Sequence, residues 1–301
     1  MSDINPRVDI AFKKLFGVEE NKDLLISLIN AIVSEEDEVE DVEILNPYNL
    51  RSFKRDKLSI LDIKARRKRD GQKYSIEIQI NDEADYDKRA LYYWGKLYTE
   101  QLEKGYQYDE LKKAIAIHIL QFTSIETNEE YHNVFRIRDD REKKAFFPDL
   151  ELHTIELNKF DNEKDGDIGK ILKKEKSALD MWTGFLAKYE LLDIENLPKE
   201  LDNPKIRKAM EIVNIMNFTK AEKEAYEERL KWLRAEASAL KKVSTTNYEK
   251  GIAKGIEKGR EEGKKSKALQ IAKNLITQGV DAKVISKSTG LSIEEIERLK
   301  E

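Results

Sequence analysis

The chain has 301 residues and no cysteine, which excludes disulfides, thiolate catalysis and cysteine-based zinc sites. Charged residues make up 38% of it, yet the net charge is only −4. A polyanionic partner must therefore meet a local basic patch, because the field of the whole protein is weak. The three histidines (His118, His132 and His153) show no metal-ligand spacing. With no membrane-length apolar run and no secretory pattern at the N-terminus, we expect a cytoplasmic protein without membrane contact.

The N-terminal 45 residues predict two helices and a strand. Asn5-Pro6 is a typical helix start, and apolar residues follow it at helical spacing. Asp9 and Lys13 lie one turn apart on the flank of that apolar stripe. A second helix is predicted over 22–33, and a short strand over 42–45.

The next stretch, 58–81, predicts a β-hairpin. Asp70-Gly71 favours a two-residue turn, because both residues tolerate the positive φ of a type I′ turn. From Tyr74 to Asn81, apolar and polar residues alternate with a period of two. One face of this strand is therefore expected to be apolar and the other polar.

Two acids and an amide are expected to meet on the polar face of the hairpin. Counting outward from a two-residue turn places Asp62 opposite Gln79 and Lys64 opposite Glu77. Opposed residues share a face, and Glu77 then lies one diagonal step from Asp62.

Beyond the hairpin, the pattern predicts a helix over 86–104 and a buried strand over 113–122. The helix is expected to pack through its aromatic residues, including Tyr92, Trp94 and Tyr98. Two further strands are predicted over 131–138 and 149–157. The expected fold is α/β (α+β), with a mixed four-stranded core sheet flanked by helices.

The C-terminal half is predicted to be helical, with helices over 168–189, 204–218 and 219–242. Thr219 and Glu222 have the spacing of a capping box at the start of the last one. We predict a three-part chain, with an α/β domain at 1–165, a helical region at 166–245 and a charged tail at 246–301.

The tail combines a glycine repeat with three short predicted helices. The repeat lies in Lys- and Glu-rich sequence and places glycine at every fourth position, namely Gly251, Gly255, Gly259 and Gly263. It indicates either a weak charged helix or connector, or a helix that lets two backbones approach closely. The helices at 268–278, 281–288 and 292–300 fit a helix-turn-helix reader of DNA. The acidic third helix favours a packing or assembly module instead.

The two acids of the hairpin fit a hard cation such as Mg²⁺, which prefers oxygen ligands. The backbone carbonyl of Ile78 would be a further ligand. The segment from Lys54 to Lys73 contains nine Lys or Arg and only three Asp. Its net charge of +6 suits a polyanionic substrate. Alternatively, the acids pair with Lys64 and Arg66 across the strands. Spacing alone leaves both interpretations open.

Taken together, these motifs resemble those of the recombination-promoting nuclease (Rpn) family, also described as PD-(D/E)XK nuclease family transposases. The resemblance rests on five groups of residues: Asp9-x-x-Phe12-Lys13-x-x-Phe16, Leu61-Asp62, Glu77-x-Gln79, Arg89-Ala90-x-Tyr92-Tyr93, and Thr289-Gly290-Leu291-Ser292 after the glycine repeat.

The resemblance implies that Asp62 and Glu77 ligate Mg²⁺, with Mn²⁺ as a substitute. Gln79 stands where the superfamily usually has a lysine, and Lys64 or Lys13 could supply the missing cation. Asp9 is either an acid contributed to the site by the first helix or an i,i+4 partner of Lys13. Arg89 either holds a phosphate or pairs with Asp85.

The function implied is that of a Mg²⁺-dependent endodeoxyribonuclease linked to recombination, mobile elements or phage. Metal-bound water would attack the phosphodiester, with Gln79 orienting it. DNA would be held by Arg89 and by a basic hairpin comprising Arg66, Arg67, Lys68, Arg69 and Lys73. A homodimer is expected, because one such site cuts one strand. The alternative is a catalytically degenerate nuclease fold that acts as a DNA-binding or protein-interaction module.

Overall fold

A computed structural model describes residues 4–48, 63–82, 85–102, 107–142, 144–160 and 177–299. The chain forms two compact units, Met1–Arg234 and Ala235–Glu301. The finer division at 165 and 245 stays a prediction. Among the described helices, none has the length and apolar character needed to cross a membrane.

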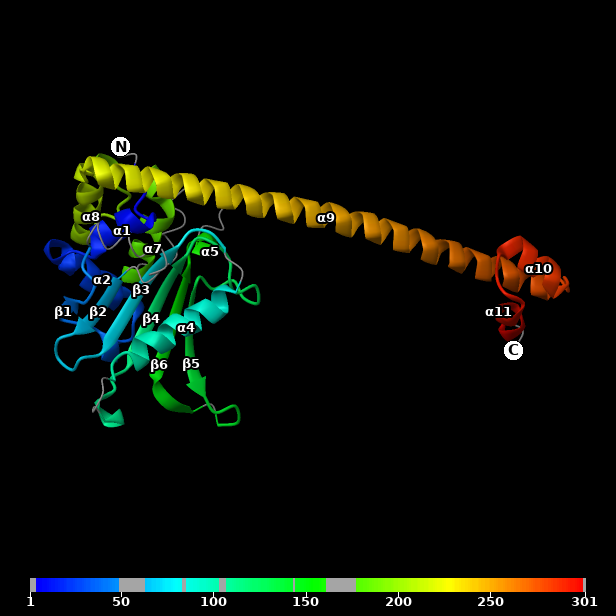
Figure 1. Cartoon of the computed structure of the whole chain (residues 1–301), viewed down its shortest axis with the longest axis horizontal. Coiled ribbons are helices and arrows are strands. Elements are labelled where there is room, and N and C mark those ends of the chain that lie inside the picture. Colours follow the sequence, from blue (N-terminus) through cyan, green and yellow to red (C-terminus); the bar gives the residue numbers. More distant parts are fainter. Residues whose placement is uncertain are drawn as a thin grey trace. The chain divides into compact units, whose positions relative to one another are not determined.

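The first unit is built on a six-stranded sheet in the order β1-β2-β3-β4-β6-β5 (Figure 1). The strands are β1 Val42–Ile44, β2 Ile63–Arg67, β3 Lys73–Gln79, β4 Ala114–Leu120, β5 His132–Arg138 and β6 Ala145–Glu156. β4 is parallel to β3 and to β6, and the other pairs are antiparallel. The predicted mixed sheet is confirmed. It has six strands because the two strands predicted after residue 130 join the same sheet.

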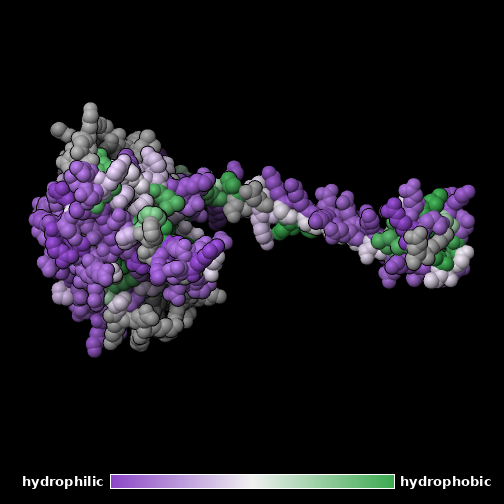
Figure 2. Space-filling model, turned by 90° about the horizontal axis from the view of Figure 1, so that it is seen from below, coloured by the Kyte–Doolittle hydropathy of each residue, from purple (hydrophilic) through white to green (hydrophobic). Residues whose placement is uncertain are grey.

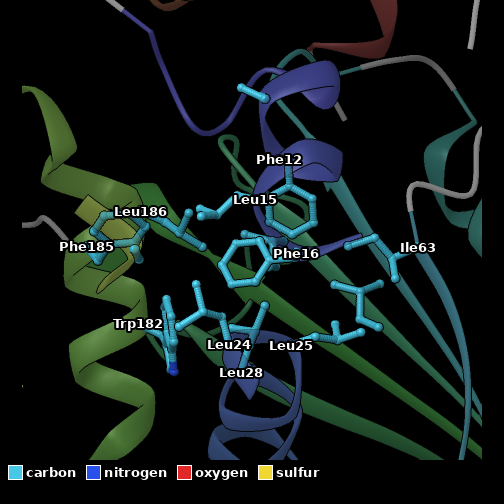
Figure 3. Packing of buried hydrophobic residues seen from close by; sticks show 14 of the residues in the cluster. Phe12, Leu15, Phe16, Leu24, Leu25, Leu28, Ile63, Trp182, Phe185 and Leu186 are labelled. Atoms are coloured by element: carbon cyan, nitrogen blue, oxygen red, sulfur yellow. The ribbon is translucent and has the colours of Figure 1, made fainter. Parts of the chain in front are cut away.

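One face of the sheet is covered by helices and carries the main hydrophobic core. These helices are α1 Asp9–Phe16, α2 Lys22–Ile32, α7 Ala178–Lys188 and α8 Pro204–Ile215. Figure 3 shows Phe16 of α1 among leucines of α2 and Trp182 of α7, with Ile63 of β2 on the other side. The ring centroids of Phe16 and Trp182 are 5.4 Å apart. Shorter elements are α5 Leu157–Phe160, η1 Glu19–Asn21, η2 Glu35–Asp37, η3 Tyr108–Glu110, η4 Tyr189–Leu191 and η5 Ile194–Asn196.

The opposite face is covered by α4, Tyr86–Thr99 (Figure 1). Its first turns pack on β4 and β6 through Tyr86 and Ala90. Near its other end, Trp94 donates from Nε1 to the carbonyl of Ala114 (2.8 Å) and stacks on Tyr98. Tyr92, however, is 65% exposed, so its predicted place in the packing surface is wrong.

The hairpin forms as predicted, but its register differs. Lys64 lies opposite Ser75, not Glu77, because the hydrogen bond from Arg67 N to the carbonyl of Gln72 closes a loop of four residues, 68–71, in place of the predicted two. Gly71 adopts the positive φ (84°) that this loop requires. Since the shift in register is an even number of residues, each side chain keeps its predicted face. Asp62 lies outside the described residues, so its position opposite Gln79 stays a prediction.

The second unit consists of most of α9 (Lys220–Thr277), α10 (Ala282–Thr289) and α11 (Ile293–Arg298). The helix predicted at 268–278 is the end of α9, which also contains the glycine repeat. The surface of this unit is mostly hydrophilic, with scattered hydrophobic side chains (Figure 2). Its small core joins α9 to the last two helices through Ala272, Ile285, Leu291 and Ile296.

Candidate functional site

Glu77 and Gln79 lie near the carboxyl end of β3, on the face that α4 covers. The alternation of the strand places their neighbours Ile76 and Ile78 against the main core. Glu77 is only 6% exposed. On the adjoining parallel strand it lies opposite His118, which in turn lies opposite Thr154 of β6. The sheet therefore aligns three polar side chains from three strands beneath one helix.

This face holds buried polar atoms that lack a hydrogen-bond partner in the described part of the chain. They are Ser75 Oγ, Tyr86 OH, His118 Nε2 and Thr154 Oγ1. Buried polar atoms are nearly always paired in native proteins, so such a group indicates a place where water or a ligand binds. The same burial lowers the pKa of His118 to about 4, with the Arg89 charge adding to the effect. His118 is therefore neutral at pH 7.

Arg89 of α4 contacts the amide of Gln79. Its Nη2 donates to Gln79 Oε1, and Gln79 Nε2 donates to the carbonyl of Asn81 (3.0 Å). These two bonds fix which way the amide points. Asp85, which is one of the two alternatives predicted for Arg89, pairs with Lys88 (2.7 Å).

Asp9, the first residue of α1, lies near the end of β3. Its Oδ2 is 2.9 Å from Nε of Arg229, so its main partner is this arginine rather than Lys13. One turn further along α9, the carbonyl of Leu233 accepts a bond from Asn81, which follows β3 by two residues. Burial raises the pKa of Asp9 against the opposing effect of Arg229. The structure thus brings Asp9 to the same edge of the sheet as Gln79.

Arg67, predicted to bind DNA, is a buried structural residue. It is 5% exposed, and its guanidinium donates to Asp70, to Gln72 Oε1 (2.5 Å) and to the carbonyls of Glu36 and Glu38 (both 3.1 Å). Because these bonds occupy its donors inside the protein, Arg67 does not fit the predicted contact with phosphate.

Most of the other basic residues of the hairpin form ion pairs with acids. Lys64 Nζ lies 2.6 Å from Glu100, and Lys68 Nζ lies 2.6 Å from Asp41. Arg66 pairs with Glu43. Burial lowers the pKa of the Lys73 ammonium. The side chain of Arg69 is 69% exposed. Surface pairs of this kind are weak, so these cations can exchange an acid for a phosphate.

A hard divalent cation fits the chemistry of this face. Among the described residues, no three acids or histidines form a ready metal site. Glu77 nevertheless supplies a carboxylate, and the orphaned polar atoms beside it suit the waters that Mg²⁺ retains. The second predicted ligand, Asp62, directly precedes Ile63, which pairs with Ile76.

The fold and this site together define an α/β protein of the PD-(D/E)XK nuclease class. More narrowly, the chain belongs to the PD-(D/E)XK nuclease family transposases, whose family model matches residues 6–243. A second model, the C-terminal HTH domain of the Rpn/YhgA-like nuclease family, matches residues 265–301. No curated protein and no solved structure matches the chain.

The second match corrects the interpretation of the last three helices as a packing or assembly module. The acidic residues of 292–300 led to that interpretation. The two matches confirm the resemblance drawn from the motifs.

Three residues of the site face were missed from the sequence: Tyr86, His118 and Thr154. The one available signal was His118, which is the single non-aliphatic residue within the strand Ala114–Leu120. Finding Thr154 would have required the strand order, because β6 pairs directly with β4 although β5 separates them in the sequence.

Proposed function

We propose that the chain is a metal-dependent endonuclease that hydrolyses phosphodiester bonds of DNA in recombination or in mobile-element or phage biology. The observation that carries this proposal is the buried carboxylate of Glu77, which lies among orphaned polar atoms in a chain of a nuclease family. A buried acid with no role in the apolar core is a candidate for a functional site.

Mg²⁺, or Mn²⁺ in its place, would be held by the carboxylates of Asp62 and Glu77 and by the backbone carbonyl of Ile78. When bound, the metal lowers the pKa of a coordinated water and polarises a phosphoryl oxygen. Gln79 orients the attacking water through its amide, whose direction is set by Arg89 and Asn81.

DNA is held by cations of the hairpin and by the C-terminal HTH domain. Arg66, Lys68, Arg69 and Lys73 of the hairpin contact the phosphate backbone. Helix-turn-helix units commonly act as dimers. Two copies of the chain would also supply one site for each strand of a duplex.

The test is cleavage of supercoiled plasmid DNA in Mg²⁺ by the wild type and by Asp62→Ala. The variant should lose metal-dependent cleavage while its thermal unfolding stays nearly unchanged. Asp109→Ala, which removes an exposed carboxylate from η3, is the matched control and should cleave like the wild type. Equal cleavage by Asp62→Ala and the wild type would sink the assignment.

The alternative, a degenerate fold that only binds DNA or protein, is favoured by glutamine at position 79 in place of lysine. Calorimetric titration with Mg²⁺ and Mn²⁺ separates the two functions. The nuclease predicts binding that is lost in Glu77→Gln. The degenerate module predicts no binding that depends on Glu77.

A further inference from the structure

The contact between Arg89 and Gln79 places a cation at the position where the nuclease motif has lost one. The Gln79 amide accepts the guanidinium of Arg89 through Oε1. A lysine at position 79 has no acceptor and would repel Arg89. Glutamine is therefore the residue that allows an arginine from the neighbouring helix to reach this point.

Arg89 is also close to the other groups of the site. Tyr86 lies about one turn before Arg89 on α4, and its ring centroid is 5.8 Å from that of His118, which lies opposite Glu77 in the sheet. Glu77 and Gln79 are two residues apart on one face of β3, a separation of about 7 Å. A guanidinium bound to Gln79 is thus within reach of a phosphate held beside Glu77.

We infer that Arg89 is a catalytic residue of the nuclease site and that the pair Arg89–Gln79 does the work of the missing lysine. The inference rests on the proposed function. In the hydrolysis, the water oxygen forms a bond to phosphorus, and the ester P–O bond breaks with its electron pair on the leaving oxygen. The attacking water loses a proton, and this proton, or one exchanged for it from solvent, neutralises the leaving oxygen. Arg89 stabilises the negative charge that develops on the non-bridging oxygens.

Arginine suits this task, because its planar guanidinium can bond to Gln79 with one edge and to a phosphate oxygen with another. Lys88, the preceding residue, has a side chain that is 76% exposed and pairs with Asp85. It carries the same charge on the same helix and serves as the matched control.

The experiment measures single-turnover cleavage of plasmid DNA in Mg²⁺ by the full chain. Arg89→Gln should lower the rate by roughly 100-fold or more, as removal of one charge-stabilising donor does. Adding Gln79→Lys to Arg89→Gln should recover at least about tenfold of that loss, because it returns a cation to the site. Lys88→Ala should stay close to the wild-type rate. Calorimetric affinity for Mg²⁺ and thermal unfolding, measured on each variant, should change little.

Cleavage by Arg89→Gln near the wild-type rate would overturn the inference, and so would a double variant no faster than Arg89→Gln. If Arg89→Gln unfolds, Arg89→Ala takes its place with the same double variant. An active wild type, together with inactive Asp62→Ala and fully active Arg89→Gln, refutes the role of Arg89 alone. A wild type that does not cleave in Mg²⁺ refutes the proposed function and this inference with it.

Discussion

The two faces of the central sheet are built from alternate residues of the same strands, yet they serve different ends. Toward α1, α2, α7 and α8, the strands present aliphatic residues such as Ile76 and Ile117, both fully buried in the main core. Toward α4, the next residues are Glu77 and His118. The side chains on the two faces are buried to a similar extent, but those on the first face are aliphatic and those toward α4 are polar or charged.

If the proposed site is correct, the α4 face gives up stability for function. Burial of an aliphatic side chain contributes about 1.5–3 kcal/mol. A buried polar atom without a partner costs about 1–3 kcal/mol. Tyr86, His118 and Thr154 each carry such an atom between α4 and the sheet. The face covered by α1, α2, α7 and α8 therefore stabilises the unit, while the α4 face has buried hydrogen-bonding groups that the proposed ligand would use.

The largest effect on stability is expected on the face covered by α1, α2, α7 and α8. Phe16→Ala removes a ring that is fully buried against Phe12 and Trp182, and it should lower the free energy of unfolding by about 3–5 kcal/mol. Urea unfolding followed by circular dichroism measures this. Ile215→Ala, at a side chain 71% exposed, should change stability by less than about 0.5 kcal/mol. Similar values for the two variants would refute this account of the core.

A smaller effect on stability is expected at Glu222, a buried acid whose carboxylate oxygens accept hydrogen bonds. It accepts bonds from Lys14 Nζ (3.0 Å), Tyr48 OH (2.8 Å) and the backbone of Thr219 (2.7 Å), which confirms the predicted capping box. Although burial raises the pKa of Glu222, these bonds together lower it to about 2. The stabilisation is therefore present above about pH 4.5 and is lost as the pH falls toward 2.

At pH 7, Glu222→Gln should be less stable than the wild type by about 3 kcal/mol, and the difference should disappear near pH 2. Urea unfolding at several pH values gives both numbers. Glu224→Gln, at an exposed position two residues further on, should show no such dependence. A difference that persists at pH 2 would mean that packing, not charge, explains the loss.

The same contrast explains how far the sequence predicted this molecule. The alternation of apolar and polar residues predicted the hairpin and the polar face of β3 correctly, because it depends only on residues that are neighbours in the sequence. The predicted register of the hairpin was wrong. Its loop is held by Arg67, which donates to the carbonyls of Glu36 and Glu38, and these acceptors lie about 30 residues earlier in the chain. The contact of Arg89 with Gln79 depends on how α4 crosses the sheet, which no local pattern contains.

The smallest expected change in the free energy of unfolding is an increase, and it is expected on the α4 face. Thr154→Val replaces a buried hydroxyl that has no partner in the described part of the chain with a methyl group of similar shape. Without the cost of the unpaired hydroxyl, the variant should be more stable than the wild type by about 1 kcal/mol in metal-free buffer. Urea unfolding with a chelator present measures it.

Thr154→Ser is the matched variant, because it keeps the hydroxyl and removes the methyl group. It should be less stable than the wild type by about 1 kcal/mol. If instead Thr154→Val is the destabilised variant, the hydroxyl of Thr154 is already paired, and the α4 face is as well satisfied as the helix-covered one. A gain in stability together with a loss of cleavage would mean that this hydroxyl is retained for the reaction at the cost of the fold.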